Sequence, residues 1–279
     1  LLITDGCIYN KNNSLSGVVY LGHPLDVETF TDDLKLFCKI KQTNFISKNV
    51  YFVRIPNSLM KHIIQLSGIL KNKRVNQPGT LPRFIIDPSC PRPIVREFLG
   101  GLFGGDGHTC VLSMHRGKRD LLTSISFSQT KNYKYLDSLK DMMMKIKTLL
   151  NKCDIHKITL QKCKETTYSK KNYCDNNKNY QLTLHLDIEE LIPFSKKIGF
   201  RYCCHKSQRL TAGVSYKRLR NEVKRQHNWL VKRVDELTNF KKIKQENPKK
   251  RVKTKLAIIQ AVDELKEKEI LIHKYAIPK

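Results

Sequence analysis

Two aspartates stand at the same place in a repeated stretch of sequence, and this repetition is the clearest chemical signal in the chain. Residues 99–107 read LGGLFGGDG, and residues 1–8 read LLITDGCI. When the two stretches are aligned, Asp5 falls on Asp106 and Gly6 falls on Gly107. A carboxylate at the C-terminal end of a helix is unfavourable against the helix dipole, so the pattern suggests that a divalent cation shares the site.

Four glycines precede Asp106 in a segment whose apolar spacing predicts a helix over residues 94–103. Each interior glycine costs up to ~1 kcal/mol relative to alanine, so a close approach of two backbones must offset the cost. We therefore expect two similar halves whose helices meet at their glycine faces and place Asp5 beside Asp106. A phosphate-binding loop is the alternative, but these glycines follow a helix and lack the Gly-Lys-Ser/Thr ending. The four are Gly100, Gly101, Gly104 and Gly105.

Both segments resemble the paired motifs of the LAGLIDADG homing endonucleases, in the two-motif, single-chain form found in introns and inteins. The second copy departs from the family name by glycine at three positions and phenylalanine at one, and the first copy is only partly present. The resemblance implies an α+β fold with two pseudo-symmetric αββαββα halves that form a saddle of antiparallel sheets. It also implies a monomer with internal pseudo-twofold symmetry, here with extra C-terminal helices.

Hydrophobic periodicity predicts a similar order of elements after each motif. The first half (1–70) is predicted to hold strands near 7–9, 17–21, 42–46 and 50–55, with helices over 25–39 and 59–66. The proline-rich stretch 71–93 is interpreted as a linker without long regular structure. The second half (94–240) is predicted to hold strands near 108–114, 121–128, 157–163 and 180–186, with helices over 133–150, 188–198 and 209–237. A basic segment and a last helix (253–270) occupy 241–279.

The charge balance of the chain favours a polyanionic partner. Lys and Arg number 52 against 25 Asp and Glu, which gives a net charge of +27. Double-stranded DNA is the first expectation. No membrane partner is expected, because no apolar run approaches the ~20 residues of a transmembrane helix.

The nine cysteines are odd in number and form no Cys-x-x-Cys pair, which predicts reduced thiols in an intracellular, reducing compartment. The nucleus and an organelle both stay open, and the basic run 248–252 resembles a nuclear localisation signal. A zinc cluster of Cys153, Cys163 and Cys174 is conceivable, although the spacings fit no standard knuckle.

The resemblance implies a catalytic centre for metal-dependent hydrolysis of a phosphodiester. Asp5 and Asp106 are the expected metal ligands, and the backbone carbonyls of Gly6 and Gly107 complete the shell. Mg²⁺ is the expected cofactor, and Mn²⁺ or Ca²⁺ can substitute in such a site.

Further catalytic groups are implied at two places in each half. The loop after the last helix of each half contributes a basic residue, which points to Lys73 and Lys206 for stabilising phosphate charge or orienting the water. Ordinary surface lysine is the alternative for each. A polar residue at the end of the second strand orders water, and Gln129 fits this role. His23 stands at the corresponding place in the first half, where a plain turn histidine before Pro24 is equally compatible.

Polar side chains at alternating strand positions are candidates for reading base edges in the DNA major groove. The basic, tyrosine-containing loop 168–180 is expected to contact the DNA backbone through Lys170 and Lys171, with a surface excursion as the alternative. The candidate readers on strands are Arg54, Ser124, Ser126, Gln181 and Thr183.

These features predict a site-specific homing endonuclease that makes double-strand breaks in a long DNA target. The presence of both aspartates favours cleavage over a decayed relic. Two alternatives use the same fold: an RNA-binding maturase that assists intron splicing, and a non-catalytic DNA-binding protein. Intron and intein origin both stay open.

Overall fold

The computed structural model describes residues 1–11, 14–39, 45–47, 50–67, 74–115, 118–161, 164–166, 178–238, 256–261 and 263–264. The chain divides into two compact units, Leu1–Val214 and Ser215–Lys279. Both motif segments lie in the first unit. In the described part of the chain, no helix is long and apolar enough to cross a membrane. The four-part division expected from the sequence stays a prediction.

The first motif is followed by a four-stranded antiparallel sheet with the order β1-β2-β4-β3. Two helices, α1 (Pro24–Lys35) and α2 (Asn57–Ser67), pack against this sheet. Helix α1 ends at Lys35 instead of continuing to 39, and the apolar side chain of Phe37 is exposed. The strands are β1 (Gly6–Lys11), β2 (Ser14–Leu21), β3 (Phe45–Ser47) and β4 (Val50–Ile55).

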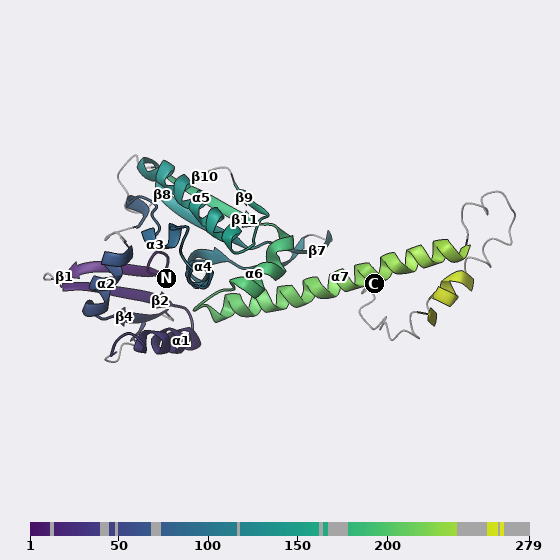
Figure 1. Ribbon diagram of the computed structural model, residues 1–279, viewed down its shortest axis with the longest axis horizontal. Helices are drawn as coiled ribbons and strands as arrows, with labels where there is room; N and C mark the ends of the chain where they lie inside the picture. Colours follow the sequence, from purple (N-terminus) through teal and green to yellow (C-terminus); the bar gives the residue numbers. More distant parts are fainter. Residues whose placement is uncertain are drawn as a thin grey trace. The chain divides into compact units, whose positions relative to one another are not determined.

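The second motif is the C-terminal part of helix α4 (Arg92–Asp106), and a second antiparallel sheet follows it. Its order is β10-β11-β8-β5, with β9 also paired to β11. Helix α5 (Leu136–Lys152) packs against β8 and β11 (Figure 1), and α6 (Leu191–Lys197) closes this half. The strands of the sheet are β5 (Gly107–His108), β8 (Ser126–Asn132), β9 (Ile158–Leu160), β10 (Lys164–Thr166) and β11 (Asn179–Leu186).

The two sheets repeat one order of strands, which confirms the α+β class with repeated halves. In each half, the strand after the Asp-Gly pair joins the next long strand, and that strand joins the last one. The segment before β1 is a turn in which the amide of Thr4 donates to the carbonyl of Leu1 at 2.9 Å. The saddle and the pseudo-twofold symmetry stay predictions.

The strands predicted over 108–114 and 121–128 are each divided. The chain forms β5, then a separate two-stranded ribbon of β6 (Leu112–His115) and β7 (Lys118–Leu122), before it reaches β8. The break has a local cause, because the backbone of Thr123 donates to Val111 and its hydroxyl accepts from the Val111 amide, each at 2.8 Å.

Each half has its own hydrophobic core. The first gathers Val19, Val53 and Met60 from the sheet and α2. The second is centred on Phe103, whose ring lies 5.3 Å from that of Phe127 and 5.2 Å from that of Phe194, between centroids. Phe103 is therefore fully buried, and it anchors the helix that ends at Asp106.

The described part of the proline-rich stretch before α4, residues 74–91, contains only short helices, as its composition predicts. They are η1 (Arg74–Asn76) and α3 (Arg83–Ile86), and α4 begins at Arg92. The stretch is more than a spacer, because Ile85 is buried in the second core. The last helix of the first unit, α7 (Cys204–Thr238), begins before the predicted residue 209 and continues into the second unit.

Candidate active site

The turn of the first motif packs directly against the C-terminal end of α4. A Cβ atom at Gly105 would overlap the side chain of Thr4, and it would lie 3.2 Å from Oδ2 of Asp5. Only a glycine at this position lets the turn approach so closely. The structure therefore brings Asp5 to the residue next to Asp106, as the repeated motif predicts, while the role of both as metal ligands stays a prediction.

The glycines of α4 face two different backbones, which corrects the expectation of a single glycine seam between two helices. Gly101 faces the first-motif turn together with Gly105. The other two face the segment after α6: the amide of Arg201 donates to the carbonyl of Gly100 at 3.0 Å, and a Cβ at Gly104 would overlap the Arg201 carbonyl. The helix is therefore held on two sides.

The carboxylate of Asp106 is mostly buried, and its environment raises its pKa above the ordinary value. Burial is the main cause, and the neighbouring charge of Asp5 adds to it. Arg74, a hydrogen bond from Gln129 and Lys206 act in the opposite direction. Two carboxylates this close favour the binding of a cation, because ionising both of them in a partly buried site is unfavourable.

Gln129 reaches Asp106 because of the register of the second sheet. Its amide donates to Oδ2 of Asp106. In the β8–β11 ladder Gln129 stands opposite Leu182, so its side chain lies on the face that carries the core rather than on the open face. The position predicted for this residue from the sequence thus places it in contact with the acidic pair.

The register also corrects the equivalence between Gln129 and His23. Gly6 pairs with Val19 in the first sheet, and Gly107 pairs with Phe127 in the second. Two residues further along, Gln129 therefore corresponds to Leu21. His23 is instead the N-cap of α1, and its ring accepts from the amide of Leu25 at 3.2 Å.

Lys206 lies at the C-terminal end of α4 and directs its ammonium at the backbone. It donates to the carbonyl of Gly104 at 2.7 Å, to that of Gly105, and more weakly to that of Phe103 at 3.5 Å. These carbonyls lie in the last turn of α4 and carry the negative end of its dipole, and that of Phe103 also accepts from the amide of Gly107. The contacts fit a helix-capping cation, and action on a phosphate stays a prediction.

Two basic residues that the sequence did not single out also lie at the acidic pair. The guanidinium of Arg74 donates to the carbonyl of Gly6, and the ammonium of Lys131 donates to the carbonyl of Arg74. Burial lowers the pKa of Arg74, and Asp106 and Asp5 oppose this effect. Burial, helped by the Arg74 charge, lowers the pKa of Lys131 to about 8.

The sequence contained signals for both. Lys73 lies outside the described residues, so its role stays a prediction, and Arg74 is the next residue in the sequence. Lys131 stands two residues after Gln129 on β8, and alternation places it on the same face of the strand.

The two glycine carbonyls expected in a metal shell differ in their surroundings. That of Gly6 already accepts from Arg74, so a metal would have to use its other lone pair. Gly107 begins β5, and a Cβ there would lie 2.9 Å from Cα of Phe103, which requires glycine at this bend. A pocket beside Gly6 is lined by the polar side chains of Arg74, Gln77, Thr80, Gln129 and Lys131 and by apolar ones that include Leu2, Ile3, Ile8 and Met142.

The open face of the second sheet carries the predicted row of polar residues. The hydroxyls of Thr183 and Ser128 lie 2.9 Å apart, and Gln181 stands opposite Thr130 in the same ladder. Their neighbours along β11, such as Leu184, are buried. The alternation predicted for this strand is thus present, with Gln181 and Thr183 on the side away from the core.

The other residues predicted to contact DNA differ in how exposed they are. Arg54 is exposed on β4. Ser126 opposes His185 on the polar side, but it is buried, and Ser124 lies half-buried between β7 and β8. Lys170 and Lys171 lie outside the described residues.

Comparison with known proteins finds a structural similarity but no sequence match. No family model matches the sequence, and no curated protein matches it. A solved meganuclease is similar to this chain. It is the LAGLIDADG meganuclease I-AabMI in its crystal structure bound to uncleaved DNA, with 12% sequence identity and a TM-score of 0.41. The alignment covers 79% of this chain and 89% of that one.

Proposed function

We propose that this chain is a divalent-metal-dependent DNA endonuclease that makes a double-strand break at one long target sequence. The observation that supports this most directly is the meeting of Asp5 and Asp106 at the end of α4. Burial and the Asp5 charge together raise the pKa of Asp106, and a bound cation would relieve both effects. The net charge of +27 suits a polyanionic substrate.

The donors at this place fit Mg²⁺. Asp5 and Asp106 offer carboxylate oxygens, Gly107 and Gly6 add backbone carbonyls, and hard cations prefer oxygen ligands of this kind. Asp5 and Asp106 would hold the ion, which when bound activates water and neutralises charge on a scissile phosphate. Mn²⁺ and Ca²⁺ share the preference for oxygen.

The residues around the pair have separable tasks in this proposal. Gln129 orients the carboxylate of Asp106 by donating to it. Arg74 and Lys131 bring positive charge beside the acids, where a phosphate would approach. Lys206 holds the end of α4 through its carbonyls, and so fixes the position of Asp106.

Recognition of the target would use the uncovered faces of the two sheets. Ser128, Thr183 and Gln181 present hydroxyl and amide groups from the second sheet, and Arg54 extends from the first. Side chains of these types donate to and accept from base edges in the major groove. Two such faces on one chain suit a long, asymmetric site.

The proposal is tested with a library of randomised duplexes and Mg²⁺, comparing the wild-type chain with Asp106→Asn. The wild type is expected to cut one sequence class in both strands, while Asp106→Asn binds the same duplex but does not cut it. Asp141→Asn is the matched control, because Asp141 is exposed and pairs with Lys145 on α5. Full cutting by Asp106→Asn contradicts the proposal, as does a wild type that binds one duplex tightly and never cuts.

A further inference from the structure

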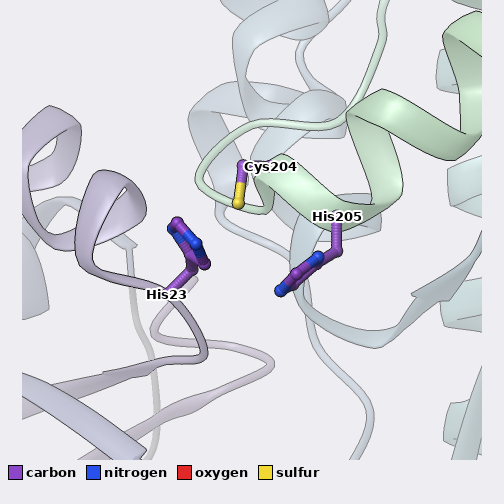
Figure 2. A group of neighbouring side chains, drawn as sticks. All are labelled: His23, Cys204 and His205. Carbon is purple, nitrogen blue, oxygen red and sulfur yellow. The ribbon is translucent and has the colours of Figure 1, made fainter.

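Three side chains capable of binding a transition metal meet in the first unit, apart from the two aspartates. They are His23, Cys204 and His205, and their ligand atoms all lie within 4.8 Å of one another. Figure 2 shows the two rings and the thiol directed into a common space. We propose that these three residues form a Zn²⁺ site.

His23 enters this group from the start of α1. Pro24 follows it in the first turn, and Nδ1 of His23 accepts from the Leu25 amide at 3.2 Å. A neutral ring that binds a metal through Nε2 carries its proton on Nδ1, so metal binding would end this bond. The Leu25 amide is exposed, and water can take over as its acceptor.

Cys204 and His205 enter from the first turn of α7, and a buried carboxylate fixes that turn against α1. The amide of Cys204 donates to Oδ1 of Asp26 at 2.7 Å, and Asp26 is buried. The rings of His23 and His205 lie 5.1 Å apart between centroids, nearly perpendicular at 87°. The two elements are therefore held together before any metal binds, which reduces the ordering that binding requires.

The donor set selects the class of metal. One thiolate and two imidazoles suit Zn²⁺, whereas Mg²⁺ and Ca²⁺ prefer oxygen. In a tetrahedral zinc site the ligand atoms lie roughly 3.5 Å apart, so closing the present separations takes small side-chain rotations. His205 is exposed and free to make such a rotation. Three protein ligands leave the fourth position to water.

A metal here would fasten two parts of the chain that are far apart in sequence. His23 precedes a helix that packs on the first sheet, while Cys204 and His205 follow α6 of the second half. Tyr202 already connects the same two parts of the chain, because its hydroxyl donates to Asp33 at 2.7 Å. Lys206, which caps α4, is the next residue after His205, so the metal would also fix the turn that holds the end of α4.

The test uses the full chain, reduced and freed of metal, titrated with Co²⁺ as a spectroscopic substitute for Zn²⁺. We expect one equivalent to bind with a thiolate-to-cobalt charge-transfer absorption, which Zn²⁺ abolishes by displacement and Mg²⁺ does not. Cys204→Ser should lose this absorption, and His23→Ala and His205→Ala should weaken binding by at least about tenfold. Zn²⁺ should raise the melting temperature of the wild type, and a chelator should reverse the rise.

Two control variants are available in the first half. Cys38 is a half-buried free cysteine whose thiol contacts the Leu34 carbonyl, and the ring of His62 contacts the Ser58 carbonyl. Cys38→Ser and His62→Ala should bind Co²⁺ as the wild type does. A wild type without the thiolate absorption overturns the proposal, as does an unchanged absorption in Cys204→Ser. If Cys204→Ser does not fold, the wild type and the exposed-site variant His205→Ala decide the question, and none of these readouts depends on DNA cleavage.

Discussion

The side-chain amide of Gln129 donates to the carboxylate of Asp106, and this contact joins the second sheet to the end of the motif helix. It exists because β8 turns Gln129 toward the core side of the sheet, opposite Leu182. The same contact lowers the pKa of Asp106 against the stronger effect of burial. Gln129 therefore favours the charged carboxylate, which is the form that binds a cation.

Replacing Gln129 by alanine is expected to slow DNA cleavage by roughly ten- to hundredfold, since a hydrogen bond to a charged group contributes about 1.5–3 kcal/mol. The defect should shrink as the pH rises, because a higher pH restores the charged form of Asp106. Rates measured from pH 6 to 9 test this. Gln181→Ala, on the open face of the same sheet, serves as control and should alter sequence preference without this pH dependence. A pH-independent defect in Gln129→Ala would show that the amide does not act through Asp106.

The acidic pair should lower the stability of the metal-free protein. Because the folded-state pKa of Asp106 is raised, the folded state binds its proton more tightly than the unfolded state does. Stability is therefore lost as the pH rises from the ordinary carboxyl value through the raised one. Asp106→Asn should melt higher than the wild type at pH 7 without divalent ions, and the gap should close at acid pH. Asp141→Asn should show no such gap, and a lower melting point for Asp106→Asn at pH 7 would contradict this explanation.

The close approach of the Arg201 carbonyl to Gly104 predicts that a side chain at this position lowers the stability of the fold. A methyl group at this position would overlap the carbonyl of Arg201, so Gly104→Ala should reduce the free energy of unfolding by about 1–3 kcal/mol or more. Gly22→Ala is the control, because nothing lies within 4 Å of a Cβ there. Urea denaturation of both variants compares them directly. Equal stabilities would mean that the backbone around Gly104 can move apart without cost.

The repeated glycines and the alternating apolar residues carried most of what the sequence could predict. Glycine spacing pointed to a close backbone contact and hence to adjacent Asp5 and Asp106, and alternation separated Thr183 from the buried Leu184. Both are local patterns with a fixed geometric meaning. The glycines did not predict that Gly100 and Gly104 face the Arg201 backbone. A row of glycines indicates that another backbone approaches closely, but it does not identify which segment that is.

Such local patterns could not predict contacts between segments that are distant in sequence. His23 and Cys204 come together because the first turn of α7 packs on α1 through Asp26, so no spacing rule connects them. Zinc motifs are recognised by short spacings, which directed attention to other cysteines. The acceptors of Lys206 could not be predicted either, since a lysine in a basic loop gives no sign that it will donate to carbonyls of α4.

Lys131 is expected to make DNA binding depend on pH. Its pKa is lowered to about 8 by burial and by Arg74, so binding should weaken as the pH rises through 8 and the charge is lost. Lys131→Arg should remove this dependence, because arginine stays charged. Stability should change in the opposite sense: between about pH 8 and 10.5 the unfolded state holds more protons, so the folded state gains stability as the pH rises. Binding that weakens equally in Lys131→Arg would assign the dependence to another group.

Lys206 and Arg54 should differ in what their loss does to DNA affinity. The ammonium of Lys206 is directed at the carbonyls of Gly104, Gly105 and Phe103, so Lys206→Met should destabilise the fold by about 1–2 kcal/mol through loss of a cation at a helix C-terminus. A lysine that only caps a helix would neutralise no phosphate, so the slope of log affinity against log salt should stay unchanged. Arg54→Met, which removes an exposed cation of β4, should reduce that slope by about one. Affinities of both variants between about 50 and 200 mM salt separate the two roles, and a slope reduced by about one in Lys206→Met would place its ammonium on the DNA instead.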